Sequence, residues 1–196
     1  MKRLIIGLTG ASGSIYGLRL IEELAKDGYD LHVVATDTAR KVVVHELGAE
    51  LETLLEPFRE RVALELIDDF FAPTASGSYK ALGMVIAPCS MGTLGSIAHG
   101  ISSNLLVRSA LVCLKERRPL VILARETPLG DIDLENMLKL SRAGATIFPA
   151  APGFYHKPES VADLVDFLVG KVLDHLGIEN RLFTKWGERS IIHEQK

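Results

Sequence analysis

The 196-residue sequence has little of several features that mark specialised classes of protein. Its two cysteines, Cys89 and Cys113, show no CxxC or histidine-rich spacing, which argues against a disulfide framework and a zinc site. There are 22 Lys and Arg against 25 Asp and Glu, and the resulting net charge of −3 does not indicate a basic surface that binds nucleic acid. The hydrophobic fraction of 47% and the charged fraction of 24% exclude a disordered chain.

Long hydrophobic runs are also missing. The mean hydropathy is positive, at +0.21, but the apolar stretch from Ala81 to Gly100 is interrupted by a proline, serines, glycines and a histidine. No run therefore reads as a membrane-spanning helix. The apolar run Leu4–Leu8 is too short for the core of a signal peptide. We expect a cytoplasmic protein with no membrane span and no bound metal.

Short apolar runs alternate with segments of helical periodicity, which predicts an α/β fold. Leu4–Leu8, bounded by a glycine-rich turn, is typical of a strand buried on both faces of a parallel sheet. Further strands are expected at 31–35, 82–87, 120–124 and 145–148, and helices at 15–27, 42–47, 92–99, 104–116, 134–143 and 161–176. We expect one domain, 1–196, with a single doubly wound, mostly parallel sheet. The least regular part, 50–79, is expected to hold one extra strand or helix and a mobile loop.

The turn after the first expected strand reads Gly7-Leu8-Thr9-Gly10-Ala11-Ser12-Gly13-Ser14. Backbone N–H groups and the positive end of the following helix favour a phosphate or another anion there. A Walker A loop is disfavoured, because Ser14-Ile15 follows Gly13 where Lys and Ser or Thr would be needed. The dinucleotide fingerprint is not met either, although Asp37 leaves NAD(P) binding open as a weaker alternative. The small residues can also serve only to pack strand against helix.

A second turn of the same kind, Pro88-Cys89-Ser90-Met91-Gly92-Thr93, follows another expected strand and opens a helix. In doubly wound sheets such turns converge on one crevice, so the hydroxyls of Ser12, Ser90 and Thr93 are expected to face one ligand. Thr36, at the end of the second expected strand, joins that edge. Taken one at a time, each hydroxyl is better explained as an ordinary helix N-cap.

Six motifs, two of them from the turns just described, together resemble a known family. In order along the chain they are 9–13 (TGASG), 87–90 (APCS), 114–120 (LKERRPL), 125–128 (RETP), 134–137 (LENM) and 152–156 (PGFYH). Together they resemble the flavin prenyltransferase family, the UbiX-like proteins, from Met1 to about Trp186. The resemblance implies a flavodoxin-like or Rossmann-like homo-oligomer, often a dodecamer, that binds FMN. It also implies transfer of a dimethylallyl group from dimethylallyl phosphate to reduced FMN, first at N5 and then with ring closure at C6.

The same resemblance implies that the prenylated FMN serves a UbiD-type decarboxylase, in ubiquinone biosynthesis or in aromatic acid decarboxylation. Residues that would hold FMN are Gly10, Ala11, Ser12, Thr36, Ser90, Met91, Gly92, Thr93 and Arg125. Residues that would hold the donor phosphate are Arg108, Lys115, Tyr155 and Lys171. At position 171 arginine is also seen in the family; lysine keeps the charge but gives up bidentate geometry.

Glu46 and Glu126, with Ser12 as a relay, resemble the acid and base groups of the family. Cationic side chains and a phenol can stabilise a phosphate leaving group without a metal. From the residues alone, an ion pair between Arg125 and Glu126 and a solvated helix face at Glu46 are simpler interpretations. Two roles stay open for Phe70: an aromatic wall beside the allyl group, or packing in the core. His156 has no assigned role.

Two other functions stay open. An FMN-dependent cysteine decarboxylase would share the fold, but its family usually shows a Pro-x-Met-Asn segment where this chain has 149–155 (PAAPGFY). A non-catalytic flavin-binding decarboxylase subunit would not need the donor-phosphate residues. The apolar helices 104–116 and 161–176, and the tail about 160–196, are expected to pack on neighbouring subunits, which would account for the positive hydropathy.

Overall fold

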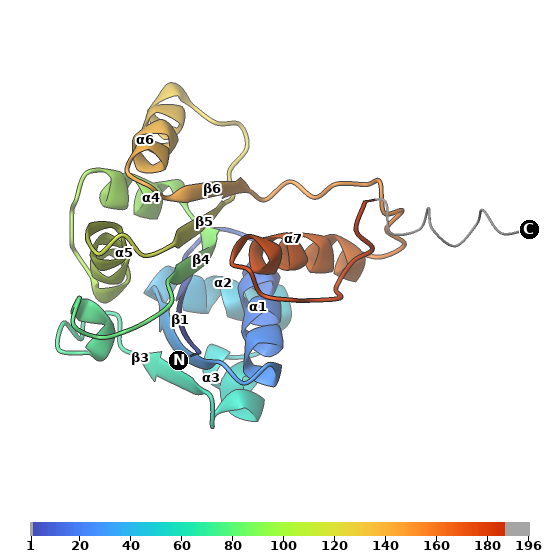
Figure 1. Ribbon diagram of the computed structural model, residues 1–196, viewed down its shortest axis with the longest axis horizontal. Coiled ribbons are helices and arrows are strands. Elements are labelled where there is room, and N and C mark those ends of the chain that lie inside the picture. Colours follow the sequence, from blue (N-terminus) through green and yellow to red (C-terminus); the bar gives the residue numbers. More distant parts are fainter. Residues whose placement is uncertain (1, 187–196) are drawn as a thin grey trace, which may run out of the picture. The chain divides into compact units, whose positions relative to one another are not determined.

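The structure is a computed structural model that describes residues 2–186 (Figure 1). It divides into two compact units, residues 1–149 and 150–196, and each is described by itself. The expectation of a single domain stays a prediction. Residues 187–196 of the expected C-terminal tail lie outside the described residues.

The first unit is built on a six-stranded sheet in which every neighbouring pair is parallel. The strands are β1 (Arg3–Leu8), β2 (Asp30–Ala35), β3 (Val62–Glu65), β4 (Met84–Cys89), β5 (Leu120–Ala124) and β6 (Thr146–Pro149). Their order is β3-β2-β1-β4-β5-β6. The chain winds outward from β1 to β3 and then from β4 to β6, so the direction reverses between β1 and β4. This confirms the doubly wound sheet and puts its ligand-binding crevice at the carboxyl ends of those two strands.

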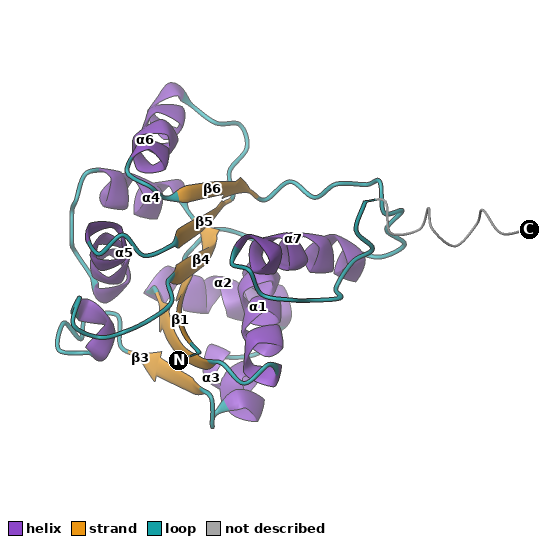
Figure 2. Ribbon diagram, in the orientation of Figure 1, coloured by secondary structure: helices purple, strands orange, loops and turns teal. Residues whose placement is uncertain are grey.

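Helices cover both faces of this sheet (Figures 1 and 2). On one face lie α1 (Ser14–Lys26), α2 (Asp37–Leu47) and α3 (Leu51–Leu55), and on the other lie α4 (Met91–Ala98), α5 (Leu105–Lys115) and α6 (Asp131–Arg142). Right-handed crossovers require this division, because the chain moves across the sheet in one direction from β1 to β3 and in the opposite direction from β4 to β6. Two 3₁₀ turns, η1 (Glu56–Phe58) and η2 (Pro73–Ala75), complete the unit.

The core lies along β4 and β5, whose residues are all buried. Continuous apolar runs suit these strands because helices cover both of their faces. Cys89, at the end of β4, and Cys113, on α5, are buried free thiols. Burial raises the pKa of the Cys89 thiol to about 12 and that of the Cys113 thiol to about 11, so neither is a reactive thiolate at neutral pH.

Several expected boundaries were wrong. The helix expected at 42–47 begins at Asp37, because the Thr36 hydroxyl accepts the N–H of Ala39 at 3.1 Å and caps a polar first turn that lacks apolar periodicity. The helix expected at 134 begins at Asp131, where the Asp133 carboxylate accepts the N–H of Gly130. The strand expected at 82–87 is β4, two residues later. The segment 50–79 holds both a helix, α3, and a strand, β3, instead of one or the other.

Between residues 150 and 186, the second unit contains one helix, α7 (Val161–His175), with irregular segments on both sides of it. A capping box begins this helix: the Ser160 hydroxyl accepts the N–H of Asp163, and the Asp163 carboxylate accepts that of Ser160. Backbone N–H groups of Glu159 and Ser160 hold the pKa of Asp163 below its usual value. Among the described residues, no helix has the length and apolar character needed to cross a bilayer.

Candidate functional site

The carboxyl ends of β1 and β4 are joined by one buried side chain. Thr9, 1% exposed, donates its hydroxyl to the carbonyl oxygen of Pro88 at 2.9 Å and accepts the N–H of Ser90 at 2.8 Å. Thr9 was not predicted as a site residue from the sequence. It could have been found from the motif TGASG, in which a threonine directly follows a buried strand. The structure thus brings the β1–α1 and β4–α4 turns to one edge of the sheet, at the switch point.

The β1–α1 turn needs glycine in two places. A Cβ at Gly10 would lie 2.8 Å from Cβ of Thr38, so only glycine lets the turn pack against the first turn of α2. Gly13 has φ 102° and is the N-cap of α1. Because glycine has no side chain, and because the first turn of α1 contains no acidic residue, this helix brings no local group to bind its free N–H groups.

A carboxylate from α2 binds those N–H groups instead. Glu46 accepts the N–H of Gly13 at 3.0 and 3.1 Å and that of Ser14 at 2.8 Å. Partial burial raises the pKa of Glu46, but hydrogen bonds from the Ser12 hydroxyl, the two backbone N–H groups and the Ser14 hydroxyl outweigh it, so the pKa lies below its usual value. The structure therefore joins Ser12 to Glu46 through a hydrogen bond. It also shows that Glu46 is more than a solvated residue on a helix face.

The β4–α4 turn carries its own cap. The Ser90 hydroxyl accepts the N–H of Thr93 at 3.4 Å and donates to the Thr93 hydroxyl at 3.2 Å. Met91 and Gly92 form the first turn of α4, and a Cβ at Gly92 would meet nothing within 4 Å. For Ser90, as for Thr36, the N-cap interpretation holds. The backbone beside Ser90 nevertheless leaves open space next to a helix N-terminus, which suits an anion or a flat ring.

Arg125 directly follows β5, and its N–H donates to the carbonyl oxygen of Cys89 at 3.2 Å. Its Nε atom is buried and has no hydrogen-bond partner among residues 2–186. Glu126 is exposed, and its carboxylate accepts the N–H of Thr127 at 3.0 Å. The simpler interpretation, an Arg125–Glu126 ion pair, is absent from the described residues. A buried guanidinium N–H without an acceptor indicates a ligand that supplies one.

The four expected donor-phosphate residues are distributed over both units. Arg108 and Lys115 lie seven residues apart on α5 and so face the same side of that helix. Lys115 ends α5 only five residues before β5 begins, which puts it toward the amino edge of the sheet, away from the crevice. Tyr155, 45% exposed, and Lys171, on α7, belong to the second unit. The first unit alone therefore does not bring Lys115 to the two turns.

Tyr155 lies in a cluster of rings within the second unit. It makes edge-to-face contacts with His156, Phe167 and Trp186, with ring centroids 5.3 to 5.9 Å apart. The His156 ring is stacked on Phe167 at 4.9 Å, and neither of its nitrogens has a hydrogen-bond partner among the described residues. In the first unit, Phe70 is 46% exposed, which disfavours a role in core packing.

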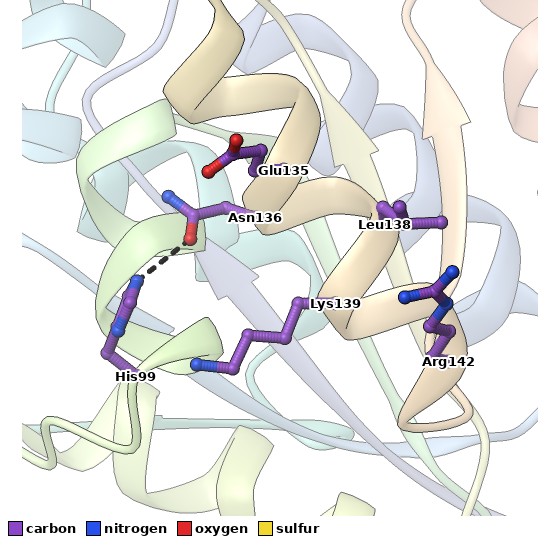
Figure 3. Close-up of a pocket in the computed structure, with 6 residues that line it drawn as sticks. All are labelled: His99, Glu135, Asn136, Leu138, Lys139 and Arg142. Carbon is purple, nitrogen blue, oxygen red and sulfur yellow. Dashed lines mark hydrogen bonds between the residues drawn. The ribbon is translucent and has the colours of Figure 1, made fainter.

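A separate hollow lies between α4 and α6 (Figure 3). Its volume is about 440 Å³, and it is lined by His99, Glu135, Asn136, Leu138, Lys139 and Arg142. Nε2 of His99 lies 3.0 Å from Oδ1 of Asn136, a contact that joins the end of α4 to α6. None of the expected site residues lines this hollow, so it does not belong to the crevice at the switch point.

The fold and the crevice define an α/β protein that binds a phosphorylated ligand at the switch point of a doubly wound sheet. The chain belongs to the flavoprotein family, whose model matches residues 1–173. Within it, the chain belongs with the flavin prenyltransferases: it is 52% identical to flavin prenyltransferase UbiX of Alkalihalophilus pseudofirmus, over 95% of this chain and 97% of that protein. This overturns the NAD(P) alternative.

Solved structures agree with this assignment. AnUbiX (PadA1), in complex with FMN and dimethylallyl pyrophosphate, matches with a TM-score of 0.90 and 39% identity, over 94% of this chain and 97% of that chain. A dodecameric FMN-dependent UbiX-like decarboxylase from Escherichia coli O157:H7 matches with a TM-score of 0.89 and 37% identity, over 94% and 98%. The family resemblance found in the motifs is therefore confirmed.

Proposed function

We propose that this chain is a flavin prenyltransferase that transfers a dimethylallyl group from dimethylallyl phosphate to reduced FMN, at N5 and then at C6. The allylic C–O bond breaks and phosphate leaves. FMN supplies the carbon-accepting nucleophile, and the protein supplies binding, orientation and proton transfer. The observation that carries this proposal is the match, over nearly the whole chain, to a structure in complex with both FMN and a dimethylallyl donor.

Residues at the switch point fit a flavin nucleotide. Arg125 presents a buried Nε–H that has no acceptor among the described residues. The open space over Gly92 leaves room for a flat ring or a phosphate beside the first turn of α4. We assign Arg125, the β1–α1 turn, Thr36 and the β4–α4 turn to FMN binding.

The pair of Ser12 and Glu46 is suited to move a proton. Glu46 is a carboxylate at neutral pH and can accept a proton, although the hydrogen bonds that lower its pKa also make it a weaker base. The Ser12 hydroxyl, which is bonded to it, can relay a proton lost from the flavin. Glu126, whose carboxylate is exposed at the end of β5, is the second acid–base group of the proposal.

The donor phosphate is assigned to Arg108, Lys115, Tyr155 and Lys171, whose side chains can stabilise the charge that develops on the leaving group. Because Lys115 lies toward the edge of the sheet away from the crevice, we propose that α5 of a second copy completes the site in a homo-oligomer. We propose a dodecamer, and the dodecameric UbiX-like structure supports that assembly size. A UbiD-type decarboxylase in the cytoplasm, in ubiquinone biosynthesis or aromatic acid decarboxylation, would then use the product.

The test is anaerobic incubation of the protein with reduced FMN and dimethylallyl phosphate, and in parallel with the diphosphate, followed by mass spectrometry of the extracted flavin. We expect a mass increase of one isoprene unit with at least one donor. A flavin mass that is unchanged with both donors would overturn the proposal. Omitting the protein controls for direct reaction between donor and flavin.

The variant Glu126→Gln separates catalysis from binding. It should retain FMN and slow transfer by about 100-fold, because it removes a proton-transfer group without changing its size. The matched control is Glu135→Gln, which neutralises another exposed glutamate, on α6. Full activity in Glu126→Gln would remove Glu126 from the acid–base groups and leave Ser12 and Glu46.

A further inference from the structure

Residues 73–79, called the strap below, connect β3 to β4 and are held on two sides. On the sheet side, the hydroxyl of Thr74, 1% exposed, donates to Oε2 of Glu65 at 2.5 Å. The hydroxyl of Tyr79 lies 2.5 Å from Nε2 of His32, whose Nδ1 lies 2.7 Å from Oε1 of Glu65. A continuous chain of hydrogen bonds therefore joins both ends of the strap to β2 and β3.

Glu65 is the centre of this chain. Its side chain is only 9% exposed and that of His32 only 14%, so a carboxylate without donors would be costly there. The Thr74 hydroxyl supplies one donor to Glu65; in the His32 tautomer that carries Nδ1–H, the ring supplies a second donor and Nε2 accepts from the Tyr79 hydroxyl. With all these groups satisfied, the position of the strap relative to the sheet is well defined.

On its other side, the strap is held by two arginines (Figure 1 shows it beside α5). Nε of Arg108, on α5, donates to the carbonyl oxygen of Ala75 at 3.0 Å. Arg118, just after α5, donates to the carbonyl oxygens of Tyr79 at 2.7 Å and Gly77 at 2.5 Å. Arg118 therefore holds the strap through its backbone carbonyls.

Arg108 connects this arrangement to the chemistry. Ala75 follows Thr74 in the same 3₁₀ turn, so the Glu65–Thr74 bond sets the position of the carbonyl that holds Nε of Arg108. The two Nη groups of Arg108 make no hydrogen bond within residues 2–186, which leaves them available to an external phosphate. A guanidinium fixed through Nε presents these groups without the loss of side-chain freedom that binding otherwise costs.

We propose that Glu65 and Thr74 are positioning residues that, through the Ala75 carbonyl, orient Arg108 toward the phosphate of the prenyl donor. This rests on the proposed function, because it assumes that Arg108 binds that phosphate. A purely structural role for the Glu65–Thr74 bond would weaken folding, and with it FMN and donor binding alike. A positioning role affects the donor and spares FMN.

The test uses Thr74→Val, which removes the hydroxyl at nearly constant size, and Thr74→Ser, which keeps it. Binding of dimethylallyl phosphate to the full-length, FMN-loaded protein is measured by calorimetry, and the KM for the donor by turnover. We expect Thr74→Val to weaken donor binding and raise the KM for the donor by roughly tenfold, with the Kd for FMN nearly unchanged. Thr74→Ser should restore donor binding.

A second variant tests whether the effect passes through Arg108. In an Arg108→Lys background the Nε contact is gone, so adding Thr74→Val should have little further effect on donor binding. A full additional loss in that background, an equal loss of FMN and donor affinity in Thr74→Val, or no loss of donor affinity would each overturn the positioning role. If the wild type binds the donor but does not prenylate FMN, the proposed function fails while the binding measurements still decide the role of Thr74.

Discussion

The β1–α1 and β4–α4 segments meet at the switch point. Each runs from a strand through a turn into a helix, but the two helices begin differently. The first turn of α4 is capped by its own Ser90. The first turn of α1 begins at a glycine and binds Glu46, a carboxylate supplied by α2. The cap of α4 is a hydroxyl from its own N-cap residue, whereas the cap of α1 is a titratable carboxylate from another helix. In the β1–α1 turn, the structural contact is therefore made by the same carboxylate to which we assign proton transfer.

Their helices also approach the sheet differently. A Cβ at Gly17 of α1 would overlap the carbonyl oxygen of Ala87 and Cδ2 of Leu8. At Gly95 of α4, the nearest atom, Nδ2 of Asn136, would lie at 3.5 Å, an ordinary contact. Close packing of α1 on β1 and β4 therefore depends on one glycine, and α4 has no such requirement.

The largest expected difference is in stability. Gly17→Ala should lower the free energy of unfolding by about 3 kcal/mol, because a backbone carbonyl cannot move aside to relieve the overlap. Gly95→Ala is the matched control and should change it by about 1 kcal/mol or less, since alanine favours the helix. Urea unfolding of the two variants measures both values. Equal losses would contradict the contrast between the helices.

Removing the Glu46 carboxylate tests whether the β1–α1 turn carries the chemistry. Glu46→Gln should slow prenyl transfer by about 100-fold in single-turnover assays, because the amide cannot take up a proton. FMN should still bind, as measured by fluorescence titration. Glu52→Gln on α3, which removes an exposed carboxylate paired with Arg40, is the control and should keep the wild-type rate. A near wild-type rate in Glu46→Gln would reduce Glu46 to a cap.

Removing the local cap of α4 should have a smaller effect. Ser90→Ala should lower the free energy of unfolding by about 1 kcal/mol, the usual loss when a serine N-cap becomes alanine. Ser96→Ala, which removes an exposed hydroxyl on the same helix, should change it by about 0.5 kcal/mol or less. Thermal unfolding compares the two variants. A larger loss for Ser96→Ala would show that Ser90 does not cap the helix.

The smallest effect concerns pH. Glu46 has its pKa lowered in the folded protein, so its contribution to stability is present above the unfolded pKa of about 4.3 and is lost as pH falls through the folded pKa. The stability difference between wild type and Glu46→Gln should therefore be constant near neutral pH and shrink in acid. Urea unfolding over a pH series measures it. A difference that grows as the pH falls would contradict a lowered pKa.

Much of the fold could be predicted from the sequence, because it depends on local patterns. The buried strands β1, β2 and β5 follow from apolar runs, and α7 follows from its periodicity. The starts of α2 and α6 were missed because polar capping residues, with no apolar repeat, determine them. The strap was missed entirely, because the hydrogen bonds that hold it, from Thr74 to Glu65 and from Arg108 to Ala75, follow no periodic pattern in the sequence.

By itself, the sequence determined the class of fold, the two turns and the family, since these rest on residues that are neighbours in the chain. Only the tertiary structure decided which distant groups meet. It placed Glu46 on the N–H groups at the start of α1 and put Lys115 toward the opposite edge of the sheet. It also left Nε of Arg125 buried, with no hydrogen-bond partner among residues 2–186. The physical reason is that hydrogen bonding and burial depend on distance in space, which a linear pattern does not contain.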